Sequence, residues 1–216
     1  MATVHAPGET AQEERLAPRH VGDEPEHPVM GVPMMGMYIF LSSEVMFFGA
    51  LFSVYFYLFG SHPLGWPPEG TEPVHWFPIP FFNTFILIMS GVTCHFATES
   101  LSHGNRKRWY LLIVSTLILG AFFELGQAFE FATARLQLGH TTNQFGSAFF
   151  IMTGFHGAHV FGGLLFIALM VGRSLRGHFT PDRHVGPAAA TLYWHFVDVV
   201  WIFLYSVLYF AVTLRA

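Results

Sequence analysis

Five long apolar stretches constrain what this 216-residue chain can fold into more than any other feature. A helix that crosses the bilayer core needs about 20 residues, whereas a membrane β-strand needs only about ten residues of alternating polarity. The stretches are longer than a strand and apolar throughout. They therefore predict an all-α, polytopic transmembrane bundle of five helices, at residues 34–59, 81–99, 109–133, 145–172 and 188–213.

The composition leaves almost no room for a soluble domain. Hydrophobic residues make up 52% of the chain and charged residues only 11%, where a soluble domain has about 25% charged residues. Residues 1–33 form a polar tail rich in Pro, Glu and His, which predicts a disordered segment, and residues 34–216 form the membrane domain. The single cysteine, Cys94, excludes an internal disulfide. The sequence has no glycine-rich phosphate loop and no basic patch, which argues against nucleotides and nucleic acids as ligands.

The basic residues predict the orientation of the bundle. Only two of the ten, Arg135 and Arg215, lie on one side of the predicted helices. The other eight share the opposite side: Arg15, Arg19, Arg106, Lys107, Arg108, Arg173, Arg176 and Arg183. Because basic residues collect in cytoplasmic loops, we expect a cytoplasmic N-terminus and tail and an external C-terminus. In the first external loop, Trp66 and two prolines predict a rigid surface turn with an interfacial aromatic anchor.

Polar side chains inside the apolar stretches are the candidate functional residues. An ionisable side chain at the bilayer centre costs about 2.5 kcal/mol or more, so such residues usually face protein. Glu44 lies about 15 Å into the first helix. His195 and Asp198 share one helix face because they are three residues apart. The full set is Glu44, Glu124, Gln127, Glu130, His156, His159, His195 and Asp198.

Each of these residues also has a purely structural interpretation. Glu44 can be a packing residue, His156 and His159 can bond carbonyls of neighbouring helices, and Glu130 can be a rim residue beside Arg135. No predicted helix contains the Glu-x-x-His pairs of a di-iron bundle, and no His-Glu-x-x-His zinc motif occurs. Residue counting leaves a bis-histidine haem open, since four histidines lie in predicted helices: His95, His156, His159 and His195. We therefore expect a buried polar constellation, with no catalytic residue and no metal site.

Five motifs, in order, give the chain a resemblance to a known family. They are Ser43 to Phe48 (SEVMFF), Trp66 to Pro68 (WPP), Gly126 to Glu130 (GQAFE), Thr153 to Val160 (TGFHGAHV) and Tyr193 to Tyr205. Each motif is moderately specific, but the five in sequence are very specific. Together they resemble subunit III of haem–copper terminal oxidases, of the cytochrome c oxidase type, over about Met34 to Val212.

The resemblance implies a subunit of a respiratory, proton-pumping cytochrome c oxidase. Haem and copper would lie in partner subunits, with none in this chain. The chain would pack on subunit I, within a complex that includes subunit II, hold phospholipid in a cleft between helix groups, and support proton uptake and turnover stability. Larger members have seven helices, and this sequence lacks the two that precede the Glu-bearing helix. Candidates for the lipid headgroup are Arg106, Lys107, Arg108, Arg173 and Arg176, whose charge suits phosphate.

Other interpretations stay open at this point. Glu44 favours a cytochrome c oxidase, because a quinol-oxidase subunit III commonly has Asp there. A quinol oxidase, a nitric oxide reductase accessory subunit and an independent haem or metal enzyme are the alternatives. The expected location is a bacterial cytoplasmic membrane, with the mitochondrial inner membrane as the alternative. Inside the bundle we expect Glu44 to hydrogen-bond His159, which lies at similar depth, in a structural role rather than in proton transfer.

Overall fold

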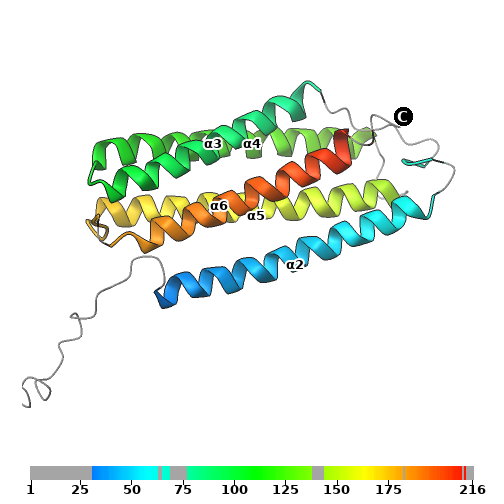
Figure 1. Cartoon of the computed structure of the whole chain (residues 1–216). Coiled ribbons are helices and arrows are strands. Elements are labelled where there is room, and N and C mark those ends of the chain that lie inside the picture. Colours follow the sequence, from blue (N-terminus) through cyan, green and yellow to red (C-terminus); the bar gives the residue numbers. More distant parts are fainter. Residues whose placement is uncertain are drawn as a thin grey trace, which may run out of the picture.

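Five long helices make up the described part of the chain (Figure 1). The computed structural model describes residues 31–62, 65–68, 77–137, 144–181, 183–210 and 212. The elements are α2 (Val32–Gly60), α3 (Ile79–Ser102), α4 (Arg106–Gln137), α5 (Gln144–Leu175), α6 (Val185–Leu204) and the π-helix η1 (Tyr205–Phe210). All five α-helices are long and apolar enough to cross a membrane, and these ranges contain no β-strand. The predicted all-α, five-helix fold is therefore confirmed.

The helix ends differ from the predicted ones by a few residues. The connection between α3 and α4 is only three residues long, with Gly104 at a φ of 76°. Asn105 caps α4, because its Oδ1 accepts a hydrogen bond from the backbone N–H of Arg108 at 3.1 Å. The last predicted helix keeps its α-helical form only as far as Leu204 and continues as η1. The predicted tail lies outside the described residues up to residue 30.

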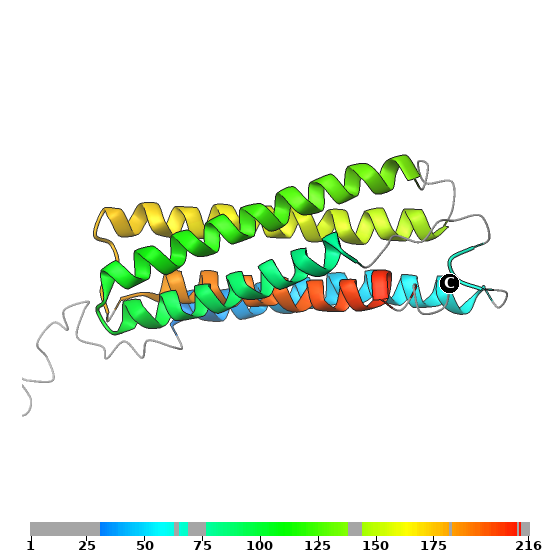
Figure 2. The same cartoon turned by 90° about the horizontal axis from the view of Figure 1, so that it is seen from above.

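The bundle is arranged around α6. α3 and α4 form an antiparallel hairpin, and α6 contacts α2, α3 and α5. Figure 1 shows α2 and the α3–α4 hairpin on opposite sides of α6, and Figure 2 shows the same helices running along a common direction. Half of the residues in the apolar window of α6 are buried, against 17% in α2. α6 is therefore the central helix, and α2 is peripheral.

The indole ring of Trp194 lies in the core of the bundle and is fully buried. Gly120 of α4 and Gly163 of α5 face this ring, and a β-carbon at either position would come within 2.8 Å of a ring carbon. The ring Nε1–H donates a hydrogen bond to Ser90 Oγ of α3 at 3.0 Å. The two glycines thus let four helices meet at one side chain, the kind of small-residue packing that membrane helices use.

The end of the bundle that carries the α3–α4 turn, the α5–α6 loop and the start of α2 is here called the basic end (Figure 1). An Nη atom of Arg106 donates a hydrogen bond to the Phe179 carbonyl at 3.1 Å, and the Arg173 guanidinium lies 5.6 Å from the centre of the Phe179 ring. Tyr110 of α4 and Ser174 of α5 share a hydroxyl hydrogen bond of 3.1 Å. Two of the predicted headgroup cations therefore hold the α5–α6 loop against the helices.

At the opposite end, Trp66 is buried rather than interfacial, so the prediction of an exposed aromatic anchor is wrong. Its side chain is only 4% exposed, and its Nε1–H donates to the Tyr55 hydroxyl at 3.0 Å. That hydroxyl in turn donates to the Val207 carbonyl at 3.2 Å. The Trp66 ring also packs edge-on against Phe145, with centroids 5.7 Å apart. The segment after α2 thus turns back over the bundle and covers the ring with protein.

Candidate functional site

The side chains of Glu44 in α2 and His159 in α5 meet inside the bundle, as expected from the sequence. Glu44 Oε2 lies 2.9 Å from His159 Nε2, and each side chain is 18% exposed. His159 Nδ1 lies 2.7 Å from the Phe155 carbonyl one turn earlier. Because a carbonyl oxygen only accepts, Nδ1 carries a proton. The pair therefore shares one further proton, held either as a Glu44 O–H that donates to Nε2 or as an imidazolium N–H that donates to the carboxylate.

Neighbouring side chains hold both the backbone and the imidazole of His159 in place. The Tyr193 hydroxyl of α6 donates to the His159 carbonyl at 3.0 Å, which brings a third helix to this point. Phe48 meets the imidazole edge-on with centroids 5.0 Å apart, and Phe47 stacks on it at 6.2 Å. The pair thus ties the peripheral helix α2 to α5 at a point that α6 also braces.

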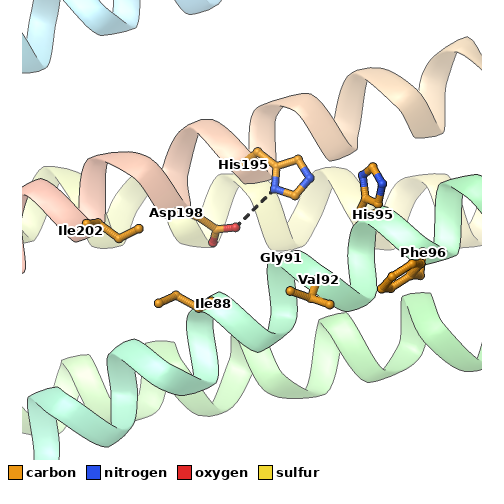
Figure 3. A pocket seen from close by; sticks show the side chains of 8 residues that line it. All are labelled: Ile88, Gly91, Val92, His95, Phe96, His195, Asp198 and Ile202. Carbon is orange, nitrogen blue, oxygen red and sulfur yellow. Dashed lines mark ion pairs between the residues drawn. The ribbon is translucent and has the colours of Figure 1, made fainter.

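A second polar pair lies on α6 and faces a groove (Figure 3). His195 Nδ1 lies 3.6 Å from Asp198 Oδ2, a distance of an ion pair and too long for a hydrogen bond. The Asp198 carboxyl rests directly on α3 at Gly91, where a β-carbon would collide with it. Asp198 is 8% exposed, but the His195 side chain is 41% exposed. The pair therefore has a covered carboxyl and an open imidazole.

The groove beside this pair, here called the α3–α6 groove, has a volume of about 450 Å³. Most of its walls are apolar, and its lining residues are Ile88, Gly91, Val92, His95, Phe96, His195, Asp198 and Ile202 (Figure 3). A second hollow of about 460 Å³ shares His95 and His195 and continues toward the basic end between α2, α3 and α6. That second hollow has more polar walls, which include Tyr38, Glu99 and His184.

The polar residues of α4 lie at its interface with α5 and η1. Gln127 and Glu130 are 4% and 7% exposed, Glu124 is half-buried, and Tyr209 of η1 faces Gln127 and Glu130. Glu130 is therefore covered by protein, in line with its place in the predicted set of buried polar residues. Its position near the membrane rim stays a prediction, since the candidate membrane span ends at Thr133. The side chain of Arg135, its suggested partner, lies outside the described part of the structure.

His156 is fully buried but takes a different environment from His159. Its ring stacks on Trp201 with centroids 5.0 Å apart and meets the edge of Phe123 at 6.0 Å. Neither ring nitrogen has a hydrogen-bond partner among the described residues. Among the described residues, neither histidine therefore bonds a carbonyl of a neighbouring helix. His156 has no hydrogen-bond partner there, and His159 bonds a carbonyl of its own helix.

The structure separates the predicted residues into three places instead of one site. These are the Glu44–His159 pair, the His195–Asp198 pair at the α3–α6 groove, and the interface of α4 with α5 and η1. Glu44 and Asp198, expected at similar depth, belong to different pairs with different histidines. His95 and His195 have ring centres 5.9 Å apart at the α3–α6 groove. Within the ranges that the structure describes, no group of three or more His, Cys, Asp or Glu is placed to hold a metal ion.

Sequence reasoning missed two residues that shape these places. Gly91 supplies the surface on which Asp198 rests, and the Tyr193 hydroxyl braces His159. A signal for Gly91 was present, because a glycine inside a helical pattern often marks a close approach. Tyr193 gave no such signal, since aromatic residues surround it in the sequence.

Comparison with known proteins identifies the family. The family profile described as cytochrome c oxidase subunit III matches residues 20–213. Cytochrome c oxidase subunit 3 of Thermostichus vulcanus is 44% identical over 188 residues, which cover 85% of this chain and 89% of that protein. The subunits 3 of Pelomedusa subrufa and Gallus gallus are 42% and 41% identical over 178 residues, which cover 81% of this chain and 67% of each. With its five membrane helices and matching sequence, the chain belongs to the cytochrome c oxidase subunit III family.

Proposed function

We propose that this chain is the non-redox subunit III of a proton-pumping cytochrome c oxidase in a bacterial cytoplasmic membrane. It packs on catalytic subunit I, in a complex with subunit II, and supports proton uptake and stable turnover. The observation that carries the proposal is the match to the cytochrome c oxidase subunit III family over residues 20–213. Within the bundle, the contact of Glu44 with His159 joins α2 to α5, which supports a structural role for these polar groups.

Purification through a tag on this chain tests the proposal. We expect haem and copper centres to co-purify, together with oxidation of reduced cytochrome c. Deletion of the gene should leave subunits I and II able to reduce oxygen, but with slower proton uptake and faster inactivation during turnover. Oxidation of a quinol but not of cytochrome c would identify the quinol-oxidase alternative. A haem spectrum in the isolated chain would contradict the non-redox assignment.

Phospholipid binding is the second part of the proposed function. All five predicted headgroup cations are exposed at the basic end, but Arg106 and Arg173 already contact Phe179. Among the described residues, the side chains of Lys107, Arg108 and Arg176 make no ion pair, so these three are available to a phosphate.

Lipid analysis of the purified complex tests this part. A Lys107→Ser/Arg108→Ser double variant should lose phospholipid that co-purifies with the wild-type oxidase. Arg183→Ser, an exposed cation in the α5–α6 loop at the same end, serves as the control. Equal lipid content in all three proteins would contradict headgroup binding by these side chains.

A further inference from the structure

We propose that Gln127, Glu130 and His156 form a buried binding site for water molecules, where α4 meets α5, α6 and η1. The site holds a small hydrogen-bonded group of waters inside an otherwise apolar bundle. The inference goes beyond the proposed function, because it concerns the interior of this chain and not its partners.

The three side chains are buried, yet their hydrogen-bonding capacity is unused. Gln127 and Glu130 are 4% and 7% exposed, and His156 is fully buried. Six covered polar atoms make no hydrogen bond within the described ranges: both ring nitrogens of His156, both carboxyl oxygens of Glu130, and the amide nitrogen and oxygen of Gln127. About 90% or more of buried polar groups in folded proteins have a partner, which is often an ordered water. Six exceptions from three side chains therefore call for a ligand that forms hydrogen bonds.

Contacts between rings join the three side chains into one region. The Trp201 ring lies 5.0 Å from the His156 ring and 6.1 Å from the Tyr209 ring, centre to centre. Tyr209 in turn lies beside Gln127 and Glu130. Tyr209 belongs to the π-helix η1, and π-helical turns occur frequently at functional sites. The polar atoms of α4 and α5 thus surround a common place that η1 covers.

The chemistry of these side chains favours water over other ligands. The amide, carboxyl and imidazole groups include both donors and acceptors, and a water molecule can serve both kinds. Acyl chains offer no hydrogen bond. In the part of the chain that the structure describes, no group of three or more His, Cys, Asp or Glu is placed to hold a metal ion.

Glu130 gives water a way into the site. It lies three residues before Thr133, where the candidate membrane span of α4 ends, which is about 4.5 Å along the helix. Gln127 lies about one turn deeper. His156 meets Phe123, about two turns deeper than Glu130, with ring centres 6.0 Å apart. The polar atoms therefore follow one another from the end opposite the basic end toward the middle of the bundle.

Radiolytic footprinting in isotope-labelled water tests the site in the complex purified through a tag on this chain. An X-ray pulse produces hydroxyl radicals from bound water, and these radicals oxidise the side chains beside it. Trp201, which stacks on His156, is the reporter. Trp194 is the matched control, because it is equally buried and its Nε1–H already donates to Ser90. We expect several times more labelled oxygen on Trp201 than on Trp194, and equal yields, whether low or high, would overturn the inference.

Replacement of Gln127 gives a second readout, whose sign differs between a hydrated and a dry interior. In a hydrated site, Gln127→Leu removes hydrogen bonds to water. The labelling of Trp201 should then fall to the level of Trp194, and the chain should leave the complex at a lower SDS concentration. In a dry interior the same change removes unpartnered polar atoms, so the chain should leave at a higher SDS concentration. That result would contradict the site.

Two features keep the test decisive. Met152→Leu changes a buried apolar side chain of α5, so it should leave both readouts as in the wild type. The labelling of the wild-type chain needs no substitution, so it decides the question even where a variant fails to fold. Neither readout depends on haem or copper, and the failure of these metals to co-purify would count against the proposed function alone.

Discussion

The contact of Gly163 with Trp194 gives a prediction whose size follows from distances. A β-carbon at Gly163 would lie 2.8 Å from two ring carbons of Trp194, whereas carbon atoms pack at about 3.5–4.0 Å. The Gly163→Ala variant must therefore move a fully buried ring that is also held by its hydrogen bond to Ser90. Overpacking of this kind costs about 1–3 kcal/mol.

The neighbouring residue provides the matched control. At Gly162 the nearest atom to a β-carbon would be the Tyr193 hydroxyl oxygen at 3.6 Å, an ordinary contact. Both alanine variants gain the same helix propensity, about 1 kcal/mol, so this term cancels in their difference. We expect Gly163→Ala to be less stable than Gly162→Ala by about 1–3 kcal/mol in SDS-induced unfolding of the solubilised subunit.

A second substitution checks the assigned cause. Trp194→Phe shrinks the ring, so adding it to Gly163→Ala should cost less than adding it to the wild type. Equal free energies of unfolding for the two alanine variants, within about 0.5 kcal/mol, would refute the packing argument. Additive effects of Gly163→Ala and Trp194→Phe would show that the loss arises elsewhere than at this contact.

Three further predictions concern the polar pair, the orientation and the metal content. Glu44→Gln keeps the hydrogen bond to His159 and should leave assembly and most oxygen reduction intact. Glu44→Ala removes this bond, so it should destabilise the bundle by about 1–2 kcal/mol and reduce the amount of assembled oxidase on native gels. A Glu44→Gln variant that assembles but does not turn over would place Glu44 on a proton path. An impermeant maleimide added from outside should label a cysteine at Ser61 and not one at His103, and the reverse pattern would overturn the predicted orientation. Elemental analysis of the isolated subunit should find no stoichiometric iron or copper, and either metal at one per chain would contradict a non-redox subunit.

The helices could be predicted from sequence because the membrane fixes their minimum length and leaves few alternatives. The hydrogen bond between Glu44 and His159 could also be predicted, since depth follows from residue counting along each helix. The contact of Glu130 with Tyr209 could not, because it depends on how η1 packs against α4.

Contacts between helices were the other limit. The position of Asp198 against Gly91 depends on how α6 is rotated and shifted relative to α3, and a periodic pattern gives no information on that register. Trp66 shows the same limit for a loop. A tryptophan near a helix end is typical of the headgroup region, and only the path of the chain after Gly60 decides that its ring is covered by protein.

The position of α6 has a consequence for how the protein is made. Among the five described helices α2 is synthesised first, yet its packing partners are α5 and α6, the last two of the five. Glu44 therefore has no hydrogen bond to His159 until a residue 115 positions further along the chain has been synthesised. Until then its carboxyl must be held by the insertion machinery, by water or by an assembly factor, because acyl chains cannot satisfy it. A chain truncated before α5 would lack His159, so the Glu44 carboxyl would stay without this partner. Such an unsatisfied carboxyl in the membrane is a feature that membrane quality control could recognise.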